Sequence, residues 1–333
     1  MDRTTAEKEW LRRISGGKSA VPQRKPTSDQ TSDQSSSKPR PKPQPTAKKH
    51  GNGFGDIAGM EDLKQRVKEG FINVLQHRDL ADAYGIRPPS MLFYGPAGCG
   101  KTFFAEKMAE EVGIHFIKVV PDDLASTMVH GTQEKIGEVF KNAERHAPAL
   151  LFFDEFDAMV PRRTGNEYNQ HYDSEVNEFL CMLNHASDKG VYVLAATNHP
   201  ERIDKAVLRT GRIDELVYVD MPDHEARKSL FALELDKLPR EEGIDMDRLA
   251  HMTQGYNCSD INYIVKSAAR KKFNEAIGCG EHTLQNITQK QLEEIISGRS
   301  PSVSSRDLRE YQRVHSEFSP KDKGGQPASI GFR

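Results

Sequence analysis

A glycine-rich loop between an apolar run and a helical segment constrains this chain more than any other feature. Residues 91–94 read Met-Leu-Phe-Tyr, which is typical of a buried parallel strand, and residues 102–112 read as a helix. Between them lies Gly95-Pro-Ala-Gly-Cys-Gly-Lys-Thr102. Glycines let the backbone N–H groups of such a loop face one concavity, and the helix N-terminus adds partial positive charge. The loop therefore predicts a phosphate-binding site.

The residue types in this loop indicate how it would hold a nucleoside triphosphate. Lys101 would reach the β- and γ-phosphates, and the Thr102 hydroxyl would contact Mg²⁺. The alternative is a glycine-rich turn that happens to precede a lysine, which the match at every fixed position argues against. The predicted nucleotide contacts in and just after the loop are Gly95, Pro96, Ala97, Gly98, Cys99, Gly100, Lys101, Thr102 and Phe103.

Two acidic residues follow the next buried-strand run, Leu-Leu-Phe-Phe at residues 150–153. An acid at the carboxyl end of such a strand faces the phosphate site. We predict that Asp154 holds Mg²⁺ through water and that Glu155 orients and polarises the attacking water. The alternative, a solvated strand end, is disfavoured by the complete loop upstream. Hydrolysis, and not only binding, is therefore predicted.

A third strand, residues 191–196, leads to a carboxamide and then to two arginines. Asn198 can hydrogen-bond the γ-phosphate and the lytic water beside Glu155. Arg209 and Arg212 bracket a turn, and we predict that they stabilise transition-state charge in a neighbouring subunit. Isolated arginines are more often solvated surface residues, but their position after the Asn198 strand favours this role.

These motifs occur in the order found in the AAA subfamily of AAA+ ATPases, which the chain resembles. The order runs from residues 54–59 through the glycine-rich loop and the acidic pair to residues 195–198 and 208–214. Residues 300–304, followed by Asp307, Leu308 and Tyr311, are similar to the C-terminal region of katanin- and spastin-like members. Valosin-containing-protein-like members share the general pattern. The resemblance covers residues 52–319.

The resemblance implies a fold, an assembly and roles for named residues. It implies a P-loop α/β domain, a parallel sheet with helices on both faces, followed by a small helical lid. It also implies a homo-hexamer that binds ATP between subunits and pulls protein substrates through a central pore. By the same resemblance, Asn198 is the sensor and Arg209 and Arg212 are arginine fingers. Five residues would lie beside the adenine and ribose: Asp56, Ile57, Gly59, Gly255 and Ser259.

Three positions depart from the pattern of the family. The tip of the first pore loop would be Met128, Val129 and His130, which lacks the usual aromatic residue. Asp173-Ser174 stands where the family carries an arginine pair, and Glu215 stands in place of a third arginine. These departures leave the hydrolytic residues intact and concern substrate grip and communication in the ring.

Composition changes along the chain and predicts its domain organisation. Residues 1–50 hold 12 Lys and Arg against 5 Asp and Glu, although the net charge of the whole chain is only −2. Residues 15–50 contain too few apolar residues to bury, which predicts a disordered basic linker. Residues 1–14 form either a short docking helix for an adaptor or an unstructured terminus. The remaining predicted parts are the α/β domain at 51–220, the lid at 221–299, the C-terminal helix at 300–319 and a disordered tail at 320–333.

Other sequence features limit the expected cellular location of the protein and the classes of ligand that it could bind. The four cysteines show no paired spacing, so neither a disulfide framework nor a zinc site is predicted. No apolar run approaches the ~20 residues of a membrane span, and we predict a cytoplasmic protein. A nucleic-acid motor is disfavoured because the basic arm lacks interleaved aromatic residues.

Two classes of function compete at this stage. The first is an ATP-driven protein remodeller, which unfolds, disaggregates or disassembles its substrates. The second is a nucleotide-switched scaffold or binding protein that no longer threads polypeptide. A third reading, an ATPase partner of a protease, needs a C-terminal hydrophobic–aromatic–any tripeptide, and Gly331-Phe332-Arg333 matches only its aromatic residue. The intact acid, sensor and arginines favour the remodeller.

Overall fold

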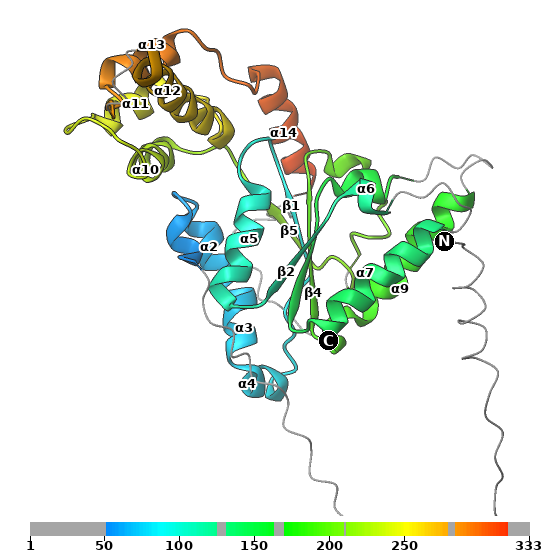
Figure 1. Ribbon diagram of the computed structural model, residues 1–333. Coiled ribbons are helices and arrows are strands. Elements are labelled where there is room, and N and C mark those ends of the chain that lie inside the picture. Colours follow the sequence, from blue (N-terminus) through cyan, green and yellow to red (C-terminus); the bar gives the residue numbers. More distant parts are fainter. Residues whose placement is uncertain (1–50, 125–130, 163–169, 210, 279–283, 319–333) are drawn as a thin grey trace, which may run out of the picture. The chain divides into compact units, whose positions relative to one another are not determined.

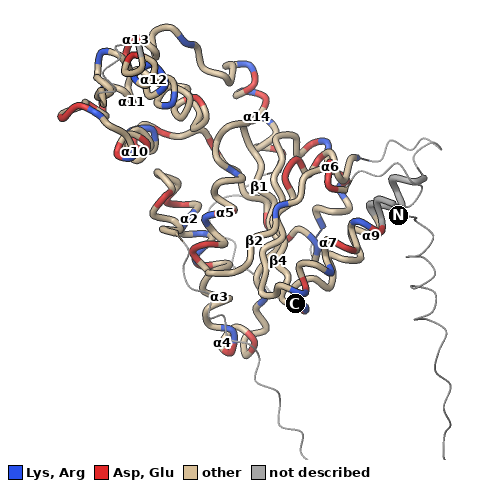
Figure 2. The backbone as a smooth tube through the Cα atoms, in the orientation of Figure 1, with Lys and Arg blue, Asp and Glu red and all other residues tan. Residues whose placement is uncertain are grey.

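The chain is described by a computed structural model over residues 51–124, 131–162, 170–209, 211–278 and 284–318. By their contacts, the described residues belong to one compact unit. The predictions for the docking helix at 1–14, the linker at 15–50 and the tail at 320–333 lie outside the described residues. Within the described part, Figure 2 shows Lys and Arg interspersed with Asp and Glu.

Five parallel strands form a single sheet in the order β2-β3-β4-β1-β5 (Figure 1). They are β1 (Met91–Tyr94), β2 (His115–Val119), β3 (Ala149–Phe153), β4 (Val191–Thr197) and β5 (Glu215–Tyr218). The three central strands are fully buried, as expected for apolar runs covered on both faces. Because all strands are parallel, the segments that follow β1, β3 and β4 meet at one edge of the sheet.

Helices cover both faces of this sheet, as Figure 1 shows. On one face lie α2 (Glu61–Val67), a π-helical turn (Lys68–Ile72), α3 (Asn73–Gln76) and α5 (Lys101–Val112). On the other lie α7 (Gly131–Arg145) and α9 (Gln170–Ala186). Short elements complete this part: η1 (Gly53–Asp56), α4 (Arg78–Ala83), α6 (Pro121–Leu124), α8 (Phe156–Met159), η4 (Ser187–Lys189) and η5 (Pro200–Arg202).

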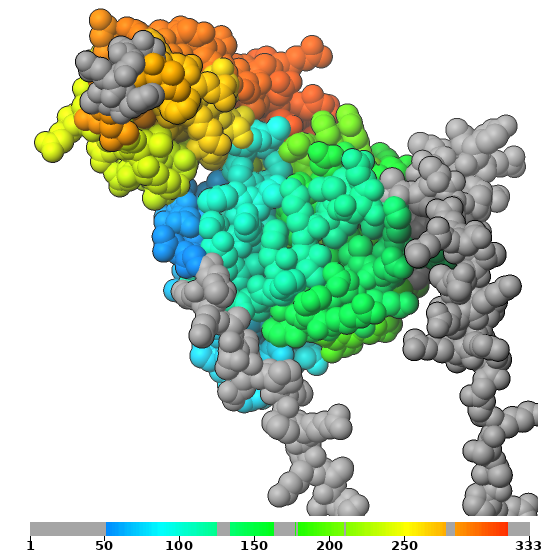
Figure 3. All heavy atoms as spheres, viewed as in Figure 1, coloured from blue at the N-terminus to red at the C-terminus, as the bar shows by residue number. Residues whose placement is uncertain are grey.

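Alternate side chains of the strands supply two cores, one for each face. Phe93 and Phe152 lie in the core under α5, where the Phe93 and Phe104 rings meet edge to face at 5.6 Å. Phe153 lies in the core under α7 and α9, with the Phe179 ring at 5.0 Å. Strand periodicity thus sends neighbouring residues to opposite cores. In Figure 3 the cyan and green atoms of this part form one continuous packed body.

Four helices after the sheet share a third core of their own. They are α10 (His224–Leu235), α11 (Met246–Met252), α12 (Cys258–Gly278) and α13 (Gln289–Ser297). Phe231, Leu249 and Leu292 are fully buried among them. Side chains cap the helix starts: Asp223 accepts from the Ala226 N–H at 2.7 Å, and Asp245 accepts from the Arg248 N–H at 2.9 Å. This is the architecture of a helical lid.

The C-terminal helix α14 (Ser305–Phe318) begins at a serine cap and returns to the sheet. Ser304 Oγ donates to Asp307 Oδ2 at 2.7 Å, so residues 300–304 lead into the helix and are not its first turn. His315 Nδ1 lies 2.8 Å from the Tyr94 hydroxyl, and its ring stacks on Tyr218 at 4.3 Å. The helix is thereby fixed to the ends of β1 and β5.

The sequence analysis did not predict strand β2. His115 to Val119 mixes polar and apolar residues without regular alternation, and only Val119 is buried. The strand lies at an edge of the sheet, where one side lacks a neighbouring strand and polar residues are tolerated.

Candidate active site

The loop between β1 and α5 adopts a conformation that only glycine accommodates easily. Gly95, Gly98 and Gly100 have φ values of 141°, 76° and 88°. A Cβ at Gly95 would lie 2.2 Å from the carbonyl oxygen of Val219, and one at Gly98 would lie 2.5 Å from Asn257 Nδ2. The loop is therefore held by backbone torsion and by close neighbours. The predicted phosphate loop is a tightly held turn at the start of a helix, a geometry suited to an anion, and phosphate binding by it stays a prediction.

Lys101 is folded onto this loop and is buried. Its Nζ donates to the carbonyl oxygens of Gly95 at 2.9 Å and Pro96 at 2.8 Å. Burial lowers the pKa of Lys101 to about 8, because charging the ammonium away from water is unfavourable. A phosphate group nearby would favour the charged form and raise this pKa again. The site is therefore electrostatically suited to an anion.

Cys99 contributes its backbone, not its thiol, to the loop. Its side chain is fully buried, with the sulfur 3.5 Å from Met221 Sδ. Burial raises the pKa of the Cys99 thiol to about 12, which leaves it protonated and unreactive. Phe103, by contrast, is exposed, and Lys107 Nζ lies 5.5 Å from the centre of its ring. Of these two predicted contacts, only Phe103 offers a side chain to a ligand.

The acid that follows β3 meets the threonine of the loop. Thr102 Oγ1 donates to Asp154 Oδ2 at 3.0 Å, although 52 residues separate the two in sequence. The other oxygen, Asp154 Oδ1, accepts from the Glu155 N–H at 3.1 Å. The same Oδ2 is 2.8 Å from Lys118 Nζ, in an ion pair that the sequence analysis missed because β2 was not recognised. The predicted metal residues are thus adjacent.

These two oxygens fit a divalent cation. A hydroxyl and a carboxylate are hard oxygen ligands of the kind that Mg²⁺ prefers. Their separation of 3.0 Å at the N-terminus of α5 allows one ion to be contacted directly by Thr102 and through water by Asp154. Mg²⁺ usually keeps several waters and binds with substrate phosphates, which agrees with so small a protein ligand set. Thr102 and Asp154 are therefore suited to hold Mg²⁺.

Glu155 has an unusual backbone for its residue type. Its φ of 51° and ψ of 45° lie in the left-handed region, just before α8. This conformation costs roughly 1–2 kcal/mol for a residue with a Cβ, and such strain concentrates at functional sites. The side chain is exposed at the carboxyl edge of the sheet. Its role in orienting the attacking water stays a prediction.

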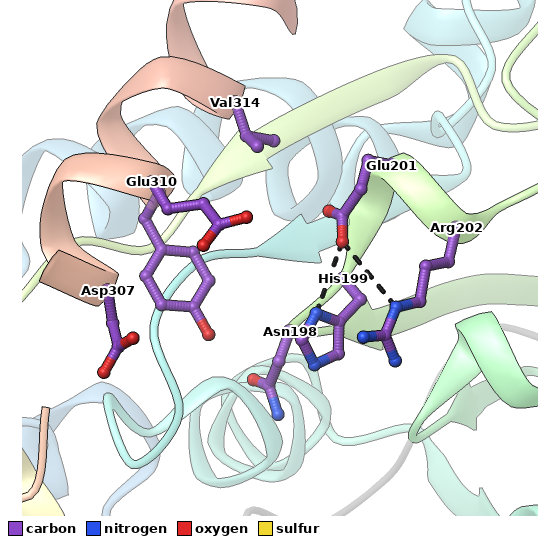
Figure 4. A pocket seen from close by; sticks show the side chains of 8 residues that line it. Asn198, His199, Glu201, Arg202, Asp307, Glu310 and Val314 are labelled. Atoms are coloured by element: carbon purple, nitrogen blue, oxygen red, sulfur yellow. Dashed lines mark ion pairs between the residues drawn. The ribbon is translucent and has the colours of Figure 1, made fainter.

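Asn198 follows β4 at the same edge and is held by its neighbours. Thr197 Oγ1 donates to Asp157 Oδ1 at 2.6 Å and accepts from the His199 N–H at 2.8 Å. The half-buried Asn198 side chain borders a small cavity of about 180 Å³. Figure 4 shows this cavity between the residues after β4 and the side of α14 that carries Asp307 and Glu310. The predicted sensor thus sits between the phosphate edge and α14.

The lid contacts the phosphate loop directly. Asn257 Nδ2 donates to the Ala97 carbonyl at 3.0 Å, and the Ser259 N–H donates to the Gly98 carbonyl at 3.1 Å. Asn257 Oδ1 also accepts from the Asp260 N–H at 2.8 Å, in the first turn of α12. Asn257 was not among the predicted contacts. The sequence pattern that could have revealed Asn257 is local: an Asn three residues before an Asp at a helix start, as in a capping box.

The Gly98–Asn257 contact makes a prediction about stability. Gly98→Ala should lower the melting temperature of the nucleotide-free protein more than Gly100→Ala does. Both glycines have positive φ, but only a Cβ at Gly98 meets a neighbour, Asn257, within 4 Å. Thermal unfolding of the two variants measures the difference. Adding Asn257→Ala to each should remove most of it, and an equal effect of both single variants would contradict this contact.

Three of the five residues predicted beside the adenine and ribose, Asp56, Ile57 and Gly59, lie in and just after η1. Asp56 is paired with Lys107 at 2.9 Å, and hydrogen bonds from Lys107 and Asn52 lower the pKa of its carboxyl. Ile57 is buried in the core under α5, so its backbone is the part fixed for a ligand. Gly59 has a φ of 64°, and a Cβ there would lie 2.5 Å from Ala226 Cβ of α10. This segment therefore packs between the sheet domain and the lid.

Arg209 and Arg212 lie at the opposite edge of the sheet from the phosphate loop. Asp214 donates its N–H to the Ser90 carbonyl at 2.9 Å, which places the turn beside the residue that precedes β1. The loop that starts at Gly95 follows β1, whose four residues span roughly 13 Å. Arg209 is exposed, and Arg212 Nη1 donates to the Ala206 carbonyl at 2.6 Å. Neither arginine is positioned to serve the loop of its own subunit.

The structure thus brings some predicted residues together and leaves others apart. The loop, the acidic pair, Asn198, the η1 segment and the lid residue Ser259 converge at one edge, while the two arginines do not. Gly255 turns the chain into α12 with a φ of 82°. The predicted pore tip, Met128, Val129 and His130, lies outside the described residues. Glu215, in place of a third arginine, pairs with Arg66 at 3.2 Å.

Comparison with known proteins agrees with this geometry. Residues 91–221 match the model of the ATPase family associated with various cellular activities (AAA). The chain is 33% identical over 273 residues to a cell division cycle protein 48 homolog of Archaeoglobus fulgidus, covering 79% of this chain and 37% of the homolog. It is 32% identical over 261 residues to a protein of Plasmodium falciparum named as a cell division cycle ATPase, covering 78% of this chain and 21% of that protein.

The matched part of each relative is therefore well under half of its length.

Among the described residues, no helix combines the length and the apolar character needed to cross a membrane. The five-stranded sheet and the phosphate loop followed by the acidic pair lie within the residues that match the family model. This chain is an AAA+ ATPase that resembles the Cdc48 homologues.

Proposed function

We propose that the chain is an ATP-driven protein remodeller that works as a homo-hexameric ring and threads protein substrates through a central pore. The observation that best supports this proposal is that the predicted catalytic residues lie at two opposite edges of the sheet. The phosphate loop and acids lie at one edge of the sheet, and Arg209 and Arg212 lie at the other. A complete site then needs a second subunit, which a closed ring supplies at every interface. An adaptor contact through residues 1–14 is also part of this proposal.

Hydrolysis would proceed by positioning and charge stabilisation. The loop N–H groups and Lys101 would hold the β- and γ-phosphates, and Thr102 and Asp154 would hold Mg²⁺, which neutralises phosphate charge when bound. Glu155 would accept a proton from the attacking water, while Asn198 would orient that water and the γ-phosphate. In the transition state, Arg209 and Arg212 of the neighbouring subunit would stabilise the charge on the transferred group. ADP and phosphate would then leave.

Nucleotide state would reach the rest of the molecule through two contacts with the site. Asn257 and Ser259 tie the lid to the loop carbonyls that flank the phosphates. His315 ties α14 to Tyr94, the residue just before Gly95. A shift of the loop on hydrolysis would therefore move the lid and α14 together. This route would convert hydrolysis into motion of one subunit against the next.

The test of threading is the predicted pore tip. Val129→Asp should abolish unfolding of a moderately stable fluorescent domain fused to an unstructured tag, because a carboxylate cannot pack against apolar substrate side chains. Val129→Trp should increase the rate, since replacing a small side chain with a large one adds about 1–2 kcal/mol of buried contact. Loss of fluorescence and ATP turnover are followed together. Leu80→Asp, at an exposed leucine of α4, is the matched control and should unfold the substrate normally.

The second candidate is a nucleotide-switched scaffold. It is favoured by one observation, the absence of an aromatic residue from Met128 to His130. If Val129→Asp and Val129→Trp both process substrate as the wild type does, the pore is not the working surface. ATP-dependent partner binding without unfolding would then become the better description.

A further inference from the structure

Lys118 places a second cation at the candidate metal site. It lies in β2, and its register partner in β3 is Phe152, two residues before Asp154. From there the side chain extends past the end of the strand, so that Nζ lies 2.8 Å from Asp154 Oδ2. Its side chain is 42% exposed, whereas that of Asp154 is 22% exposed. The lysine thus reaches in from the solvent side and covers the carboxylate.

The oxygen that Lys118 contacts is the one that faces Thr102. Asp154 Oδ2 accepts from Thr102 Oγ1, while Oδ1 accepts from the Glu155 N–H. A divalent cation held between Thr102 and Asp154 would therefore approach the oxygen that the ammonium already occupies. Two cations close to one carboxylate repel each other, and its single negative charge cannot neutralise both of them. Lys118 and the metal must compete.

We propose that Lys118 is a tethered counter-ion that neutralises Asp154 when no metal is bound and is displaced from it when a metal–nucleotide complex enters. This inference rests on the proposed role of Asp154 and Thr102 as the metal residues. It has two consequences of opposite sign. Lys118 weakens the binding of the divalent cation, because displacing the ammonium costs free energy. It strengthens the binding of metal-free nucleotide, because it adds positive charge beside the phosphates.

The experiment compares metal and nucleotide binding in Lys118→Met and wild-type full-length chain. With ADP bound, the affinity for Mn²⁺ is measured from the electron paramagnetic resonance signal of the free ion. Lys118→Met should bind Mn²⁺ about threefold to fivefold more tightly, the upper part of the range expected for a partly exposed ion pair. With EDTA present, binding of fluorescent mant-ADP should weaken by about twofold to fivefold. Both measurements are independent of turnover.

Matched variants separate charge from structure. Lys118→Arg keeps the positive charge and should stay within about twofold of wild type in both measurements. Lys189→Met removes a lysine of similar exposure that pairs with Glu144 at 2.7 Å, at the opposite edge of the sheet, and should change neither. If Lys118→Met lowers the melting temperature while Mn²⁺ affinity stays at or below the wild-type value, Lys118 is only a structural ion-pair partner and the proposal is wrong.

One further variant tests the role of Asp154 as a metal residue separately from the role of Lys118. Asp154→Asn should weaken Mn²⁺ binding, since the amide carries no charge. If Asp154→Asn binds Mn²⁺ as well as wild type, the assignment of Asp154 to the metal is wrong. If Asp154→Asn weakens binding but Lys118→Met matches wild type, the assignment stands and the counter-ion role of Lys118 alone is excluded.

Discussion

Glu155→Gln is expected to bind ATP normally and to lose hydrolysis by about 10²- to 10⁴-fold, the range for removal of a general base. The amide keeps the size of the side chain but cannot take a proton from water. Glu155 lies in the left-handed region of the backbone, is exposed at the carboxyl edge, and is not one of the loop residues that would hold phosphate. Release of phosphate and retention of radiolabelled ATP measure the two properties separately.

Two companion variants define the limits of this result. Lys101→Ala should lose nucleotide binding itself, because its ammonium is the buried cation of the loop. Glu144→Gln, which makes the same carboxylate-to-amide change at a residue paired with Lys189, should hydrolyse ATP at the wild-type rate. Normal turnover by Glu155→Gln would refute its water-orienting role and would direct attention to another acid of the same edge.

The sequence was sufficient to predict the fold because the strongest patterns coincide with the buried strands. The central strands are continuous apolar runs that are buried on both faces. A parallel sheet delivers the segments that follow them, namely the glycine-rich loop, the acidic pair and Asn198, to one edge. The phosphate loop could be recognised because it needs glycine: a Cβ at Gly95 or Gly98 would clash with neighbouring atoms in the structure. At these positions the local sequence pattern and the packing of the folded chain require the same residue type.

The residues that the sequence did not reveal depend on contacts between distant segments. Lys118 lies on an edge strand whose alternation of exposed and buried positions is weak, and its pairing with Asp154 follows from the neighbouring position of β2 and β3. Asn257 shows a local capping pattern, but its bond to Ala97 spans 160 residues. Periodicity and motif spacing carry no information about such pairs. They can be predicted only once the sheet order and the lid position are known.

The second large effect concerns the arginines, which are expected to act on the site of a neighbouring subunit. Arg212→Ala should reduce turnover by about 10³- to 10⁵-fold, the usual contribution of an arginine finger, while ATP binding by the single subunit persists. The reason is positional. The turn that carries Arg212 lies beside Ser90 at the start of β1, while the phosphate loop begins after its end. Specific activity of the wild type should also rise with protein concentration, since assembly creates the complete sites.

Mixing two inactive variants tests this arrangement directly. Arg212→Ala subunits keep Glu155, and Glu155→Gln subunits keep Arg212, so an interface that joins the two in the right order has every group it needs. If rings assemble at random from equal amounts, about a quarter of the interfaces are of this kind, and activity should approach that fraction of wild type. Loss of the Arg212 contact with the Ala206 carbonyl could also disturb folding, and Arg209→Ala, at an exposed side chain, provides the second variant. A mixture that is no more active than its two parents, or turnover that is independent of concentration in a monomer, would show that the arginines act within their own subunit or not at all.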